Sequence, residues 1–123
     1  MIYRAPVDAL ASGDLRIDVA SADGGAVVCT WTGKSNDRSP QLVLGPWFET
    51  LLAAKPPRIE MHFEKLDHFN SSTITVIIQF IQEARKRGVQ LVMVYNQALK
   101  WQKLSFDALR VFAKDAAFEL RAM

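Results

Sequence analysis

The sequence predicts an α/β fold in which a mixed sheet of four to five strands opens with an N-terminal hairpin and packs against three main helices. Three observations predict it. Two strand-like segments flank a glycine-containing turn, apolar segments with helical spacing then alternate with short β-branched runs, and the run 89–95 is apolar enough for a central strand. An opening hairpin followed by βαβ units implies a mixed sheet with right-handed crossovers. The 123 residues are expected to form one domain, 1–123.

Each element has its own signals. In the first half we expect a strand at 15–19, a tight turn at 22–25, a strand at 26–32, a polar loop at 33–39 and a helix from Pro46 to Lys55; residues 40–44 are ambiguous between extended chain and a first helical turn. In the second half we expect a strand at 58–63, a helix from Asn70 to Gly88, a strand at 89–95, a helix around 101–112 and a short closing strand at 118–120. Pro46 suits the first position of a helix because its missing N–H costs nothing there. The last helix rests on an apolar stripe at helical spacing, Trp101, Leu104, Ala108 and Phe112.

Composition places the chain among globular proteins and excludes several functions. Half of the residues are hydrophobic and 23% are charged. The net charge of +2 is spread over both signs without blocks, so we expect no nucleic-acid binding. No window approaches the ~20 apolar residues of a membrane span, and residues 1–6 are not the start of a signal peptide. The basic cluster 85–87 precedes Gly88, where it is expected to oppose the negative end of a helix dipole.

Cysteine and histidine usage argues against metal and cofactor chemistry. Cys29 is the single cysteine, so no internal disulfide can form and a reducing, cytoplasmic location is expected. It lies in an alternating strand pattern and is expected to be a small core residue. No His, Asp, Glu or Cys cluster has metal-ligand spacing, and Gly33-Lys34-Ser35 lacks the earlier glycine that a phosphate-binding loop needs. We therefore expect no metal and no cofactor.

The most distinctive chemical feature is the segment Phe69-Asn70-Ser71-Ser72-Thr73-Ile74, between a strand and an apolar helix. Asn70 can cap this helix by accepting a hydrogen bond from the backbone N–H of Ser72 or Thr73. Ser71 would then lie in the first turn, where free N–H groups and the helix dipole stabilise an added phosphate. Ser72 is the alternative acceptor, because a shift of one residue in the cap exchanges the two roles.

Two other interpretations of this segment remain open. The simpler one is a well-capped helix with no further function. The other is a hydrolytic pair in which His68 activates Ser71, since the intervening loop could bring them together. No glycine-lined elbow or oxyanion-donor pattern surrounds Ser71, which disfavours the hydrolase.

The segment and its surroundings resemble the STAS domain of bacterial anti-sigma-factor antagonists. In that family a strand leads into Asp-Ser-Ser-Gly-Leu, which opens a long apolar helix, and the first Ser is the phosphoacceptor. Residues 69–74 lie over this motif with Ser71 in the acceptor position, and residues 85–94 resemble the helix end and the following strand. Asn70 replaces the usual acid. Thr73 replaces the usual glycine, which adds bulk where a kinase or partner must approach.

The resemblance implies a bacterial, cytoplasmic signalling protein that regulates transcription by partner switching and is not an enzyme. Such a protein binds an anti-sigma factor or a serine/threonine kinase, is released by phosphorylation and is restored by a phosphatase. No nucleic acid or membrane is expected as a partner. The alternative is a constitutive STAS-like scaffolding domain without phosphorylation. On the inferred topology the contact surface contains Asn70, Thr73, Lys34, Arg38 and Asn96, at the end of the sheet that carries Ser71.

Overall fold

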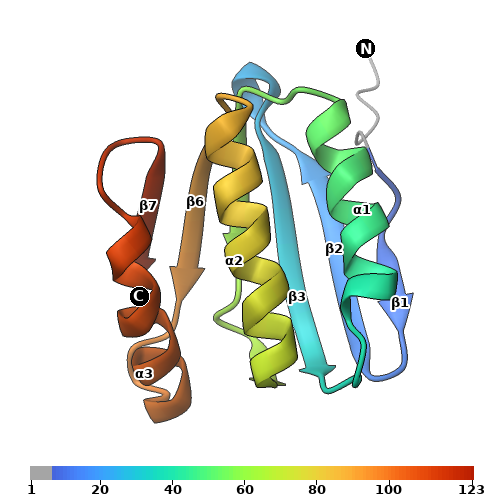
Figure 1. The fold of residues 1–123 in the computed structure, drawn as a ribbon, viewed down its shortest axis with the longest axis vertical. Coiled ribbons are helices and arrows are strands. Elements are labelled where there is room, and N and C mark those ends of the chain that lie inside the picture. Colours follow the sequence, from blue (N-terminus) through green and yellow to red (C-terminus); the bar gives the residue numbers. More distant parts are fainter. Residues whose placement is uncertain (1–6) are drawn as a thin grey trace.

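A computed structural model describes residues 7–123, and the N-terminal residues 1–6, for which we expected no signal peptide, lie outside this range. The elements follow one another as β1 (Leu10–Ser12), β2 (Leu15–Ser21), the short 3-10 turn η1 (Asp23–Gly25), β3 (Val27–Ser35), α1 (Gln41–Ala53), β4 (Arg58–His62), β5 (Leu66–Phe69), α2 (Ser71–Lys86), β6 (Gln90–Tyr95), α3 (Lys100–Leu109), η2 (Arg110–Phe112) and β7 (Phe118–Ala122) (Figure 1). The α/β class, the opening hairpin and the three main helices are confirmed.

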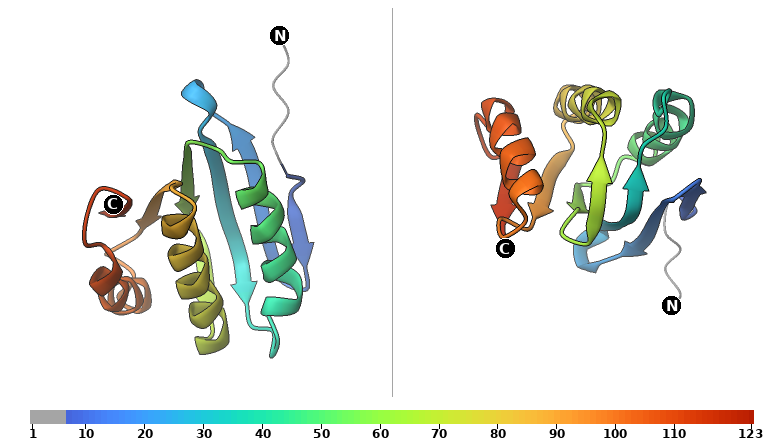
Figure 2. Two further views of the ribbon diagram at one scale, coloured as in Figure 1. Left: turned by 45° about the horizontal axis from the view of Figure 1, so that its top comes forward. Right: turned by 90° about the horizontal axis from the view of Figure 1, so that it is seen from below.

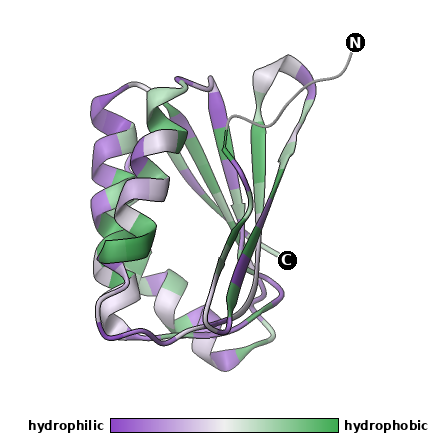
Figure 3. Ribbon diagram, turned by 90° about the vertical axis from the view of Figure 1, so that its right-hand side faces the viewer, coloured by the Kyte–Doolittle hydropathy of each residue, from purple (hydrophilic) through white to green (hydrophobic). Residues whose placement is uncertain are grey.

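The strands form one mixed sheet of seven strands. Its order is β1-β2-β3-β4-β6-β7, and β5 pairs with the end of β3 beyond β4. The first three strands are antiparallel, whereas β4, β5, β6 and β7 all join by parallel pairing. The helices lie together on one face of this sheet (Figures 2 and 3). The carboxyl ends of the parallel strands therefore lie at one end of the molecule, where α1 and α2 begin (Figure 1).

The sheet has more strands than the four to five that we expected. The two strands missing from the sequence prediction, β1 and β5, have three and four residues, too few to show a period of two. The expected loop at 33–39 is also wrong in its first part, because β3 continues to Ser35. Gly33 takes φ +82° at an irregularity in the pairing with β5, so a glycine that suggests a loop instead marks a bulge within a strand.

The first helix begins earlier than Pro46. Residues 40–44, left ambiguous above, form its start: Pro40 occupies the cap, and its carbonyl oxygen accepts a 2.8 Å hydrogen bond from the Leu44 N–H. Pro46 lies inside the helix, so the prediction of its position was wrong. A proline there cannot bond the carbonyl of Leu42, but Leu42 is 74% exposed and water can reach that carbonyl. Gly45 precedes the proline and has no Cβ to clash with its ring.

The core lies between the helices and the sheet. The helix α2, expected to be apolar, buries Val76, Ile77, Phe80 and Ile81, and the ring of Phe80 stacks on Phe48 of α1 at 4.3 Å between centroids. Cys29 is fully buried on β3, as expected. Burial raises the pKa of its thiol to about 12, because the thiolate would be poorly solvated there.

The apolar stripe predicted for the third helix faces the core only in part, through Trp101 and Phe112. The buried residues of α3 are Gln102, Phe106 and Leu109. In contrast, Leu104 is 63% exposed and Ala108 is also exposed, so these two members of the apolar stripe do not belong to the core. The buried amide of Gln102 accounts for the orientation. It donates to the carbonyls of residues 63 and 66, at 2.6 and 3.1 Å, in the turn between β4 and β5.

The basic cluster at the end of α2 forms specific ion pairs. Arg85 contacts both carboxylate oxygens of Asp115, at 2.9 and 2.8 Å, and donates to the carbonyl of Phe112. Arg87 pairs with Glu49 of α1 at 2.6 Å and with Glu83 at 2.9 Å. These residues therefore tie α2 to its neighbours, in addition to opposing the helix dipole.

The other face of the sheet carries no helix in residues 7–123 (Figure 3). Two valines of β6, Val92 and Val94, lie on this face and are nevertheless only 0% and 4% exposed. Their cross-strand neighbours are long polar side chains: Glu60 and His62 on β4, and Glu119 and Arg121 on β7. The valines therefore lie among polar side chains, and of these Glu60 and His62 are only 21% and 24% exposed and lie 3.2 Å apart. No helix of the described range is long and apolar enough to cross a membrane.

Candidate functional site

The expected helix cap lies at the carboxyl end of β3, where α2 begins. Asn70 has extended φ and ψ of −87° and 174°, and its Oδ1 accepts hydrogen bonds from the backbone N–H of Thr73 (2.9 Å) and from the Thr73 hydroxyl (2.7 Å). Its Nδ2 donates to the carbonyl of Asp37 at 2.7 Å, and its backbone N–H donates to the carbonyl of Ser35 at 3.0 Å. Asn70 therefore caps α2 and also fixes the loop that leads from β3 to α1.

Thr73 lies in the interior. Its side chain is fully buried, and its Oγ1 lies 2.7 Å from the hydroxyl of Ser35, which is 3% exposed. The geometry fits a chain in which Ser35 donates to Thr73 and Thr73 donates to Asn70 Oδ1. The expectation that Thr73 contacts a partner is therefore wrong. Its β-branched side chain faces the sheet, where it joins the start of α2 to the end of β3.

The structure distinguishes the two serines that the sequence left open. Ser71 is the first residue of α2 and is exposed, whereas Ser72 is half-buried. The N–H groups of Thr73 and Ile74 bond to Asn70, and those of Ser71 and Ser72 have no acceptor among the described residues. Ser71 therefore combines an accessible hydroxyl with unused N–H donors and the positive end of the helix dipole.

The other three residues expected on the contact surface, Lys34, Arg38 and Asn96, have different surroundings. Lys34 and Arg38 are exposed, Lys34 at the end of β3 and Arg38 in the following loop. Asn96 is half-buried and shapes the turn before α3: its Oδ1 accepts from the N–H of Ala98 at 2.9 Å, and its own N–H donates to the side-chain Oε1 of Gln102 at 2.7 Å. Lys34 and Arg38 are thus available at the surface, while Asn96 has a structural role.

The hydrolase alternative finds no support in the geometry. His68 is exposed on β5, pairs in register with Lys34, and lies 5.9 Å from the Trp101 ring between centroids. Within residues 7–123 no hydrogen bond joins His68 to Ser71. Nor does this range contain a group of three side chains arranged to hold a metal ion.

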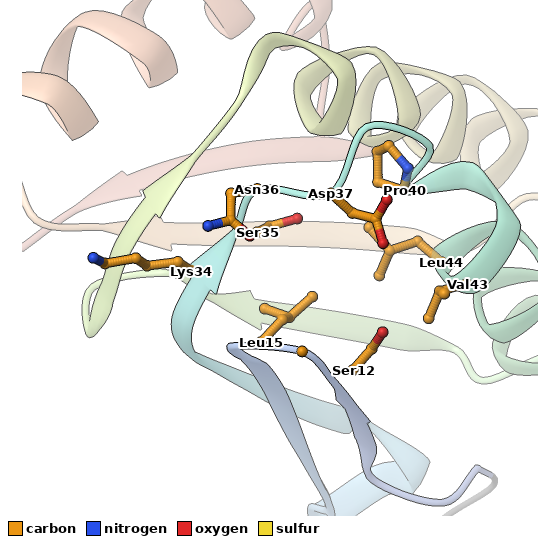
Figure 4. A pocket seen from close by; sticks show the side chains of 10 residues that line it. Ser12, Leu15, Lys34, Ser35, Asn36, Asp37, Pro40, Val43 and Leu44 are labelled. Atoms are coloured by element: carbon orange, nitrogen blue, oxygen red, sulfur yellow. The ribbon is translucent and has the colours of Figure 1, made fainter.

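Sequence reasoning missed two features of this end of the molecule. One is the buried pairing of Ser35 with Thr73, which lie far apart in the sequence. The other is a small cavity of about 80 Å³ beside the loop after β3, lined by the apolar residues Leu15, Val43 and Leu44 and by polar residues that include Ser12, Asn36 and Asp37 (Figure 4). Its lining comes from β1, β2, β3 and α1, so no local pattern in the sequence could have revealed it.

Comparison with known proteins identifies the fold. No protein-family model matches the sequence, and no curated protein matches it significantly. Among solved structures, an anti-sigma factor antagonist from Mycobacterium paratuberculosis matches with a TM-score of 0.67 at 16% identity, over 91% of this chain and 90% of that one. The unphosphorylated form of the anti-sigma factor antagonist SpoIIAA matches with a TM-score of 0.53 at 11% identity, over 76% of this chain and 97% of that one.

A third similar chain belongs to a complex from Pseudomonas aeruginosa, that of the diguanylate cyclase SiaD with its activator SiaC. It matches with a TM-score of 0.58 at 18% identity, over 94% of this chain and 98% of that one. The protein is therefore an α/β protein whose helices cover one face of a mixed sheet. More particularly, it has the STAS fold of the anti-sigma factor antagonists, which confirms the resemblance expected from the sequence.

Proposed function

We propose that the protein is a non-enzymatic signalling module of one domain, 1–123, that binds a protein partner through the end of the sheet carrying Ser71, and that phosphorylation of Ser71 switches this binding. The observation that carries the proposal is the accessible hydroxyl of Ser71 at the first position of α2. The partner would be an anti-sigma factor or a serine/threonine kinase, with a phosphatase to reverse the modification, in the bacterial cytoplasm. The similarity to two anti-sigma factor antagonists supports this class of function.

A phosphate on Ser71 would change the surface and leave the fold intact. The cap hydrogen bonds run from Asn70 to Thr73, so they do not involve the Ser71 hydroxyl. The phosphate adds nearly two negative charges beside unused N–H groups, which makes the modified state stable. A partner that approaches this end would meet that charge directly, together with Lys34 and Arg38.

The first test is mass spectrometry of the protein isolated from its own cells. We expect a species heavier by about 80 Da, the mass of one phosphoryl group, in the peptide that contains Ser71. Fragmentation should assign the modification to Ser71 and not to the half-buried Ser72. A uniformly unmodified protein under several growth conditions would contradict the switch.

A binding measurement tests the same proposal independently. Once a partner has been purified with the protein, Ser71→Ala should keep the affinity, and Ser71→Asp should lower it by tenfold or more because the charge faces the partner. Thr75→Asp is the matched control, since Thr75 is exposed one turn further along α2. Equal affinities of Ser71→Ala and Ser71→Asp for the partner would contradict the proposed phosphorylation switch.

A constitutive scaffolding module is the second candidate. It is favoured by one observation: the Oδ1, Nδ2 and backbone N–H of Asn70 are all engaged in structural hydrogen bonds. These bonds explain the presence of Asn70 at the cap without any phosphorylation. If the protein is a constitutive scaffolding module, the isolated protein carries no phosphate, and Ser71→Asp binds its partner as tightly as Ser71→Ala does.

A further inference from the structure

The third helix carries an exposed apolar surface that the core does not use. Leu104 and Val111 are 63% and 65% exposed, and Ala108 between them is also exposed. These three residues follow one another at intervals of four and three, so they share one face of the helical segment 100–112. We call them the α3 stripe. It is separate from the opposite side of α3, where Gln102, Phe106 and Leu109 are buried.

The position of α3 leaves this stripe unpartnered. The helix lies at one edge of the helix layer, with α2 on one side and no further element of the described range on the other (Figures 1 and 2). Leu104 and Val111 are large and Ala108 between them is small. A side chain of a second helix could therefore pack over Ala108, because helices pack by inserting ridges into grooves at axial separations of roughly 8–10 Å.

The side chains around the stripe are more often positive than negative. The segment 100–115 contains Lys100, Lys103, Arg110 and Lys114 and two acids, Asp107 and Asp115, and Asp115 is paired with Arg85 of α2. Lys103 and Arg110 share the carboxylate of Asp107, at 2.8 and 3.3 Å, so it cannot neutralise both. Neither Lys100 nor Lys114 forms an ion pair within residues 7–123. Among the described residues, Lys100 and Lys114 therefore remain as unpaired cations at the two ends of the stripe.

We propose that the α3 stripe is a docking surface for an amphipathic helix of another protein whose apolar face is flanked by Asp and Glu. Apolar contact would cover the stripe, and the acidic flanks would meet the cations around it. A second copy of this chain fits poorly, because two such surfaces would bring the same cations together. An anionic membrane fits less well, since the stripe consists of three residues and has no exposed aromatic ring. The proposal does not depend on the role of Ser71.

The test is site-specific photo-crosslinking of the full chain in its own cells. A benzophenone amino acid replaces Leu104, and the same probe at Gln82, which is exposed on α2, serves as the control. Mass spectrometry then identifies the crosslinked peptide. We expect a peptide of another protein, with apolar residues at intervals of three and four and Asp or Glu beside them, from position 104 only.

Two variants test the chemistry of this contact. The double variant Lys100→Glu/Lys114→Glu should lower the crosslinking yield at least about fivefold, because it reverses the attraction. Its thermal unfolding should match that of the parent chain, since neither lysine forms an ion pair with any residue of the range 7–123. Protein without the photo-crosslinking residue should compete for the partner and lower the crosslinking yield. The Val111→Ser variant should lower it less than the parent chain does.

Every other outcome overturns the proposal. Crosslinks to a second copy of the chain would make the stripe a self-association surface, and crosslinks to lipid would make it a membrane contact. A yield at position 104 no higher than at Gln82, a peptide without acidic flanks, or a yield unchanged by charge reversal would each show that no acidic helix docks there.

Discussion

The buried hydrogen bond between Ser35 and Thr73 should contribute measurably to stability, and Thr73→Val tests this. Valine has nearly the shape of threonine, so the substitution removes the hydroxyl and leaves the packing almost unchanged. Ser35 then loses its partner while it remains 3% exposed, and Asn70 Oδ1 loses one of its two donors. An unsatisfied buried polar group costs about 1–3 kcal/mol.

We therefore expect Thr73→Val to lower the free energy of unfolding by about 2 kcal/mol, and Ser35→Ala to lower it by about 1 kcal/mol, because Thr73 can still donate to Asn70 after the second change. The double variant should lose about 2 kcal/mol instead of the additive 3, since it leaves no orphaned hydroxyl.

The assay is equilibrium unfolding in urea, followed by the fluorescence of the tryptophans, of which Trp31 is fully buried. The control is Thr75→Val on the exposed side of the same helix, which should change stability by less than about 0.5 kcal/mol. A loss below about 0.5 kcal/mol for Thr73→Val, or strict additivity in the double variant, would refute the hydrogen-bond chain.

Three further outcomes follow from residues described above. Gly33→Ala should destabilise the protein by at least about 2 kcal/mol more than Gly24→Ala in the same urea assay, because both glycines have positive φ but only the Cβ at 33 would lie 1.8 Å from a backbone oxygen. The Cys29 thiol, with its pKa raised to about 12 by burial, should resist iodoacetamide at pH 8 in the folded protein and react once urea unfolds the chain; rapid labelling of the folded protein would contradict its burial. Although partial burial opposes it, the hydrogen bond from His62 holds the pKa of Glu60 below its ordinary 4.5. As the pH falls, the Glu60 carboxylate therefore takes up its proton in the unfolded state at a higher pH than in the folded state. The free energy of unfolding thus falls as the pH drops below about 4.5. Glu60→Gln should make that fall shallower, as urea midpoints between pH 7 and 3 would show.

Much of the fold could be predicted because its signals are local. The hairpin turn, the long apolar α2 and the buried β6 can each be recognised from a few neighbouring residues. The Asn70 cap belongs to the same group, since its partner Thr73 is three residues away. The class of the fold and the position of Ser71 at a helix start follow from these elements.

The remaining features depend on contacts between distant residues. Gln102 is polar, and only the carbonyls of the turn between β4 and β5 explain why α3 buries it and leaves Leu104 exposed. Thr73 of α2 is likewise buried because Ser35 offers a hydroxyl from β3. Helical spacing identifies the apolar residues of a helix, but the tertiary hydrogen bonds decide which side faces inward.

The helix-free face of the sheet has a consequence for how the protein behaves at high concentration. Among the described residues, the neighbours of Val92 and Val94 on this face include the side chains of Glu119 and Arg121, which pair with each other at 2.9 Å. Truncating either one uncovers a β-branched strip on a flat surface, which favours sheet-to-sheet association. Substitutions on this face should therefore reduce solubility and shelf life well before they alter the melting temperature.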